Sequence, residues 1–203
     1  MMTRQVKVAA RPDTEDHVLL LEQRENALAT QKSTADKLAA EVGSLQSTTG
    51  RLQGKIAAEQ EFEQKMAAAK ARFSADEAEV LRDGDRFIIR LKKLAFPLGK
   101  ANLTPQSLSL LAKVRNAVAN LGPGRVTIEG HTDATGTKAK NRRLSEERAG
   151  AIKEYLQIQT PVTTDTVAIG LADSKPIASN KTKDDRAQNR RVDIIVEPAA
   201  ITH

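Results

Sequence analysis

The stretch that decides the fold of this 203-residue chain is Gly130-His131-Thr132-Asp133-Ala134-Thr135-Gly136, followed at 141–149 by Asn-Arg-Arg-Leu-Ser-Glu-Glu-Arg-Ala. The apolar run at 126–128, just before it, predicts a buried strand. After it, apolar residues recur at spacings of three and four, which predicts a helix over about 140–157. Asp133 is therefore expected on a strand-to-helix loop, and Arg148 about two turns into the helix.

An acid and an arginine placed in this way suit a ligand that carries both charges. The planar guanidinium of Arg148 can hold a carboxylate through two parallel hydrogen bonds, and Asp133 can accept from an ammonium. Alternatively, Asp133 and Arg148 pair only with each other, or cap the helix. The residues alone leave both readings open.

Strands and helices alternate on both sides of this stretch. Apolar and polar residues alternate over 86–94, and apolar runs at 166–170 and 191–197 predict two more strands, with a short helical turn at 183–188. Thr104-Pro105 supplies an N-cap and a first-position proline for another helix. That helix is expected to end at 122–124 and to bury Leu108, Leu111, Val114 and Val118. With the strand at 125–130, the order β-α-β-α-β-β predicts an α/β sandwich with one mixed sheet.

The amino-terminal part has a different composition, rich in Ala, Glu, Gln, Lys and Leu. Residues 1–12 predict a disordered lead-in, and residues 13–82 predict a long α-helical, coiled-coil-like segment. Heptad steps give a mostly apolar seam, best from Ala35 to Ile56, with polar intruders at Arg24, Gln31, Thr49, Glu59 and Glu63. One isolated helix cannot bury such a seam, so we expect a homodimer through residues 20–80.

Two arrangements of this segment compete. The run Ser47-Thr48-Thr49-Gly50 could turn and fold the segment into an antiparallel hairpin. Glycines at 43, 50 and 54 favour that hairpin, because each costs about 1 kcal/mol inside a helix. The heptad register nevertheless continues unbroken through Leu45, Leu52 and Ile56, so we expect a continuous helix.

Composition argues against several classes of function. The chain has no cysteine, which excludes disulfides and thiolate metal sites. Its net charge is +6, but the bases are interleaved with acids and aromatics make up only 2%, so a nucleic-acid partner is not expected. His131 has no neighbouring nucleophile or acid pair, and Gly122-Pro123-Gly124 lacks the spacing of a phosphate-binding loop. We expect no enzyme, metal or cofactor.

Three separated blocks resemble the OmpA-like peptidoglycan-binding domain, a family shared by outer-membrane porins, peptidoglycan-associated lipoproteins and flagellar stator proteins. The blocks lie at 96–105, at 130–149, and at 176–180 leading to Asn-Arg-Arg-Val-Asp at 189–193. They follow the family's order over residues 84–197. The resemblance implies the same α/β fold, for a domain at 83–198 with a loose tail at 199–203.

The resemblance also implies a site for diaminopimelate of the peptidoglycan stem peptide, with its ammonium on Asp133 and its carboxylate on Arg148. Further positions that match the ligand loops are Thr135, Asn141, Arg190 and Gly99, the last through its backbone only. Asn141 could also cap the helix, and strand alternation should send Arg190 toward the site and Arg191 away. At 97–99 the family often places an acid or amide, and this chain has Pro-Leu-Gly instead.

The function that the resemblance implies is a non-catalytic wall anchor in the periplasm, associated with the outer membrane and the cell wall. The start of the chain lacks the apolar core of a signal peptide, and no run is long enough to span a bilayer. We therefore expect an export signal upstream of Met1, and membrane attachment only through a segment outside this chain. The alternative is an envelope adaptor whose coiled coil carries the function and whose wall-binding site is degenerate.

Overall fold

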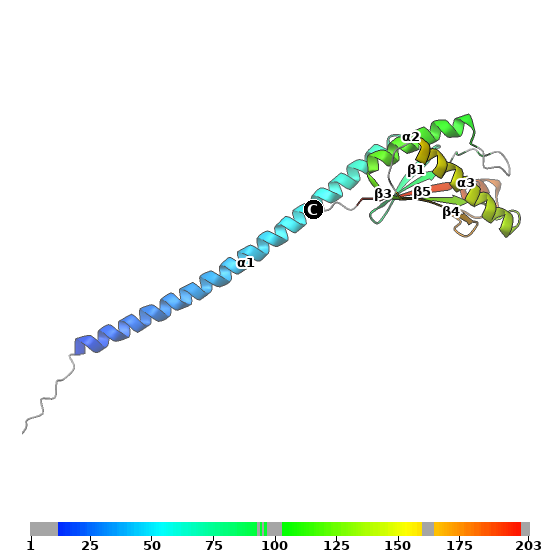
Figure 1. Ribbon diagram of the computed structural model, residues 1–203. Coiled ribbons are helices and arrows are strands. Elements are labelled where there is room, and N and C mark those ends of the chain that lie inside the picture. The colour runs from blue at the N-terminus through cyan, green and yellow to red at the C-terminus, as the bar shows by residue number, and fades with distance from the viewer. Residues whose placement is uncertain (1–11, 93, 95, 97–102, 160–164, 200–203) are drawn as a thin grey trace, which may run out of the picture. The chain divides into compact units, whose positions relative to one another are not determined.

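The computed structural model describes residues 12–92, 94, 96, 103–159 and 165–199 (Figure 1). The chain divides into two units, Met1–Glu59 and Gln60–His203. The described part of the first unit is helical throughout, and the second unit carries a five-stranded sheet with its helices. No helix in the part that the structure describes is both long and apolar enough to cross a membrane.

Helix α1 spans Pro12–Lys70 without a turn at 47–50, so the continuous helix is confirmed and the hairpin is not formed. The predicted end of this helix at residue 82 is wrong. The helix stops twelve residues earlier, and Ala78–Asp83 form strand β1. Val80 lies on the heptad steps that continue from Ile56, but in the structure it is one of the alternating buried residues of that strand. Of the predicted lead-in and tail, residues 1–11 and 200–203 lie outside the described residues.

The last turns of α1 belong to the second unit and pack on its core. The ring of Phe62 stacks on that of Phe87 with centroids 4.1 Å apart, and Met66 and Ala69 are buried. The apolar side of the helix is therefore covered by its own chain from residue 62 onward. The predicted dimer seam cannot extend to residue 80, because the apolar side chains of residues 62–69 are packed against the core of their own chain.

The sheet is mixed, as predicted, but it has five strands. They are β1, β2 (Arg86–Leu91), β3 (Pro123–His131), β4 (Asp165–Ala172) and β5 (Val192–Pro198), in the spatial order β1-β2-β5-β3-β4. Only β3 and β4 are parallel among these neighbours. Ile89, Ile194 and Ile128 face one another across three strands and are fully buried, which places the centre of the core under β5.

Helices α2 (Pro105–Leu121) and α3 (Lys138–Gln159) cover one face of the sheet (Figure 1). Thr104 caps α2 by accepting a hydrogen bond from the backbone N of Ser107 at 3.2 Å. The prediction that Leu108 is buried is wrong, since this side chain is 40% exposed and Leu110 is buried instead. Leu108 falls outside the helix face formed by the buried residues of α2.

Two glycines let α3 approach the sheet closely. Gly130 of β3 and Gly170 of β4 are register partners. A Cβ on Gly130 would overlap the backbone carbonyl of Ser145, and a Cβ on Gly170 would overlap the backbone N of Glu146. This contact fixes the height of α3 over the sheet a turn before Arg148.

Candidate functional site

The topology brings three distant segments to one edge of the sheet. Strands β3 and β5 are antiparallel with Gly130 opposite Val192, so the loop that follows β3 lies beside the residues that precede β5. Strand β2 ends there too, because Leu91 is also paired with Val192. Asp133, Arg190 and the described residues 92, 94 and 96 therefore share this edge, although they are far apart in sequence.

Asp133 is buried, with 7% of its surface exposed, and its carboxylate is fully engaged. It accepts hydrogen bonds from the backbone N of Thr135 at 2.9 Å and from the Thr135 hydroxyl. Its other oxygen accepts from Arg190 Nη1 at 2.8 Å. Burial raises the pKa of Asp133, but the hydrogen bonds from Thr135 and Arg190 outweigh burial, so this pKa lies below its usual value. The carboxylate is therefore charged at neutral pH.

Arg148 reaches the same edge from α3. It is 9% exposed, and its guanidinium carbon lies 4.9 Å from the centre of the Phe96 ring, which is a cation–π contact. Burial lowers the pKa of Arg148, the charge of Arg190 lowers it further, and the charge of Asp133 opposes both. Arg190 and Asp133 therefore both lie within electrostatic reach of Arg148. An arginine nevertheless stays protonated at neutral pH.

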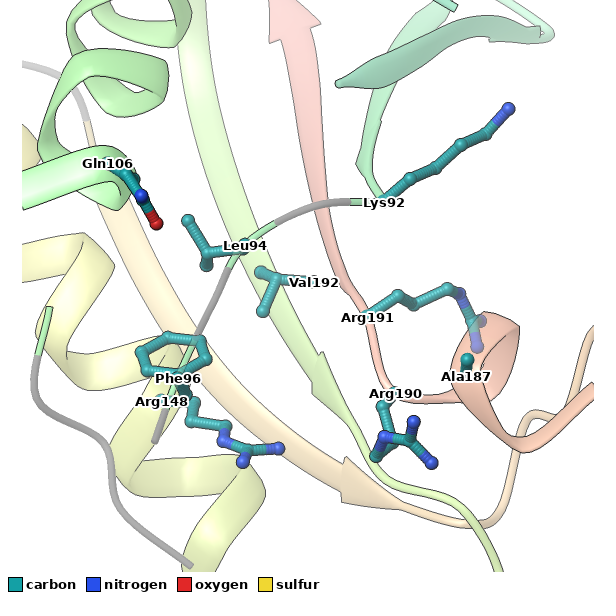
Figure 2. Close-up of a pocket in the computed structure, with 9 residues that line it drawn as sticks. All are labelled: Lys92, Leu94, Phe96, Gln106, Arg148, Ala187, Arg190, Arg191 and Val192. Carbon is teal, nitrogen blue, oxygen red and sulfur yellow. The ribbon is translucent and has the colours of Figure 1, made fainter. Parts of the chain in front are cut away.

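A pocket of about 380 Å³ opens beside Arg148 and Arg190. Its lining is Lys92, Leu94, Phe96, Gln106, Arg148, Ala187, Arg190, Arg191 and Val192. Figure 2 shows apolar Leu94 and Val192 near the middle of this lining, with Phe96 and Arg148 together on one side and Arg190 and Arg191 on the other. The pocket thus combines an apolar floor with a cationic rim, which suits an anionic group on an aliphatic chain.

The other predicted site residues have different roles. Thr135 is exposed and donates to Asp133, and Asn141 is buried and donates from Nδ2 to the backbone carbonyl of Asp133 at 3.2 Å. Asn141 lies inside α3, so the alternative that it caps this helix is wrong. Thr137 accepts the hydrogen bond from the backbone N of Lys140 at 3.3 Å. Both predicted residues shape the Asp133 loop. Gly99 lies outside the described residues.

Arg190 contacts Asp133, but strand alternation is not what places it there. It is the C-cap residue of α4 (Lys183–Asn189) and not a strand residue, so strand alternation does not orient it. Arg191 is buried and donates to Asp193 Oδ2 at 3.1 Å and to the carbonyl of Lys175 at 3.1 Å. Sequence reasoning assigned no role to Phe96, because only the fold brings its ring onto Arg148.

His131, just before the Asp133 loop, is almost completely buried. Its Nε2 lies 3.7 Å from Glu129 Oε2 and 3.8 Å from Asp193 Oδ2. Burial, and next the charge of Arg191, lower the pKa of His131 to about 4, so it is neutral at pH 7. No cluster of three or more His, Cys, Asp or Glu side chains among the described residues could hold a metal ion.

Comparison with known proteins agrees with this geometry. The OmpA family model matches residues 95–190. The chain is 38% identical over 103 residues to the peptidoglycan-binding protein ArfA of Mycobacterium tuberculosis. The aligned residues cover 51% of this chain and 32% of that protein. It is 34% identical over 120 residues to the probable lipoprotein YiaD of Escherichia coli, covering 59% and 55% respectively. The chain thus spans less than two thirds of the length of either relative.

A solved structure gives the same assignment. The cell wall anchor of the T6SS from Pseudomonas aeruginosa aligns with a TM-score of 0.58 at 26% identity, over 68% of this chain and 97% of that one. Both proteins therefore share the fold described above. The chain contains a domain of the OmpA family.

Proposed function

We propose that this domain binds peptidoglycan without catalysis, by holding the zwitterionic end of diaminopimelate in the stem peptide. One observation carries the proposal: Asp133 and Arg148 are buried charges of opposite sign within electrostatic reach of each other, and Arg190, which donates to Asp133, lines the same pocket as Arg148. That end of the ligand has an ammonium and a carboxylate on the same carbon. Two fixed charges of opposite sign are its natural complement.

In the bound state, the carboxylate accepts two parallel hydrogen bonds from Arg148. The ammonium donates to Asp133 in exchange for Arg190. Phe96 keeps the Arg148 guanidinium in place beneath the ligand, and the apolar pocket floor packs against the ligand's methylene chain. Binding of this kind needs no metal and no proton transfer.

The relatives support a place in the cell envelope. One is named a peptidoglycan-binding protein, one a probable lipoprotein, and the matched structure a cell wall anchor. We infer that this chain likewise works as an envelope anchor in the periplasm, between the wall and an outer-membrane partner. An envelope adaptor with a degenerate wall site is the alternative, and the buried, charged Asp133 disfavours it.

Co-sedimentation with purified sacculi tests the proposal. The wild-type chain should pellet with sacculi, and Asp133→Asn, which keeps the shape but removes the charge, should stay in solution. Asp36→Asn, an exposed acid on α1, is the matched control and should pellet normally. Equal pelleting of Asp133→Asn and the control would contradict the assignment.

We also propose that α1 forms a homodimer through the seam that remains available before residue 60. Its large apolar residues are 46–64% exposed, including Leu38 at 64%, Leu45 at 58% and Val42 at 46%. The three glycines of this region lie off the seam, and nothing stands within 4 Å of where their Cβ would be. Joining two weak wall contacts on one dimer raises avidity through effective concentration.

A further inference from the structure

The side chain of Asn180 joins the two segments that carry Asp133 and Arg190. Its Oδ1 accepts from the backbone N of Ala134 at 3.1 Å and from Nδ2 of Asn189 at 3.0 Å. Ala134 directly follows Asp133, and Asn189 directly precedes Arg190. One carbonyl oxygen therefore bridges the loop after β3 and the end of α4, beside the ion pair.

Asn180 is itself held firmly. Arg186 Nη1 donates to the backbone carbonyl of Asn180 at 2.9 Å and to that of Lys181 at 3.1 Å. Asn189 is 1% exposed, and its Oδ1 accepts from the backbone N of Ile177 at 2.9 Å and of Ala178 at 3.0 Å. These bonds fix the loop that carries Asn180 onto α4. None of these bonds involves Asp133, Arg148 or Arg190.

The ion pair between Asp133 and Arg190 cannot serve as the anchor of the loop during binding. A ligand ammonium that takes the carboxylate removes the bond to Arg190. The hydrogen bonds from Thr135 move with the loop, because they lie within two residues of Asp133. The Asn180 bridge reaches from a separate, fixed segment, and it remains when the ion pair opens.

We propose that Asn180 is a positioning residue of the binding site, which holds the Asp133 loop in place while the ligand's ammonium replaces Arg190. This role rests on the proposed function. It requires only the acceptor oxygen of the side chain, since both bonds are accepted by Oδ1. An aspartate at this position can make the same two bonds, and an alanine can make neither.

Calorimetry with meso-diaminopimelate tests the role. Asn180→Ala should weaken binding about tenfold, because the Asp133 loop loses the hydrogen bond from Ala134 to Asn180 that holds it in place. Asn180→Asp should stay within about threefold of the wild type, because it keeps the acceptor. Asn120→Ala, on the exposed side of α2, is the control and should bind normally. Equal weakening by the alanine and aspartate variants would overturn the role.

A second measurement needs no ligand. The pKa of Asp133, followed by NMR, should rise in Asn180→Ala, because a looser loop makes its hydrogen bonds less of the time, and should not change in Asn120→Ala. If the wild type fails to bind diaminopimelate while Asn180→Ala still raises this pKa, the ligand assignment fails and the positioning role stands. If folded Asn180→Ala keeps both the wild-type affinity and the wild-type pKa of Asp133, the positioning role is wrong.

Discussion

The carboxylate of Asp133 and the guanidinium of Arg190 come from positions 57 residues apart and meet at 2.8 Å. The two partners differ in burial: the side chain of Asp133 is 9% exposed and that of Arg190 is 45% exposed. When a ligand's ammonium takes the carboxylate, Arg190 can turn into water, and no buried charge is left unpaired. The site is therefore preformed around Asp133 and adjustable at Arg190.

Arg148→Lys should bind sacculi at least about tenfold more weakly, although the charge is kept. A single ammonium cannot reproduce the two parallel hydrogen bonds of the guanidinium, or its flat contact with Phe96. Arg143→Lys, on an exposed position of the same helix, is the matched control and should bind normally. Binding is measured by co-sedimentation at several protein concentrations. Wild-type binding by Arg148→Lys would show that Arg148 does not make two parallel hydrogen bonds to the ligand's carboxylate.

Gly130→Ala should lower the free energy of unfolding by about 2 kcal/mol or more, because its Cβ would overlap the backbone of α3. Gly150→Ala should instead raise it by about 1 kcal/mol, since Gly150 is helical and has nothing within 4 Å of a Cβ. Urea unfolding of both variants measures the difference. A tolerated alanine at 130 would mean that α3 does not sit as close to the sheet as described.

The buried His131 makes stability depend on pH. Its pKa is about 4 in the folded state and 6.5 normally, so below pH 6.5 the unfolded chain binds a proton that the folded chain does not. Stability is therefore lost as the pH falls from 6.5 to 4, by about 3 kcal/mol at most. His131→Gln should lose less stability than the wild type over this window. Parallel curves of unfolding free energy against pH for the two proteins would contradict this.

Leu45→Glu should turn the full chain from a dimer into a monomer in light scattering, because it places two like charges in the seam. Ser47→Glu, two residues away and off the seam positions, should leave the dimer intact. A fragment of residues 60–203 should be monomeric and folded, whereas one beginning at 84 would lack β1 and the buried Met66. A full chain that is monomeric at all concentrations would rule out the seam.

Much of the site could be predicted because its signals are local. A strand, a short loop and an amphipathic helix place Asp133 and Arg148 by chain distance alone. The part that could not be predicted depends on strand pairing. The contact between Asp133 and Arg190 depends on β3 and β5 being antiparallel neighbours. The spacing of residues along the sequence does not reveal that pairing.

The end of α1 at Lys70 also depends on strand pairing. Val80 sits at a heptad position, and a heptad cannot be told from a short strand by one apolar residue. What decides is pairing: Val80 lies opposite Ile89 in the sheet and is 4% exposed. Phe62 and Met66 likewise continue the helix pattern, but they face Phe87 and the core of their own chain and not a second helix.

The most direct test of the central claim compares two muropeptides that differ by one carboxylate. Diaminopimelate has a carboxylate on the carbon that bears its free ammonium, and lysine at the same position of the stem peptide has none. By calorimetry, the wild-type chain should bind the diaminopimelate peptide and fail to bind the lysine peptide, and Asp133→Asn should bind neither. Equal binding of both peptides by the wild type, or binding of neither, would contradict the claim that Asp133 and Arg148 hold the zwitterionic end.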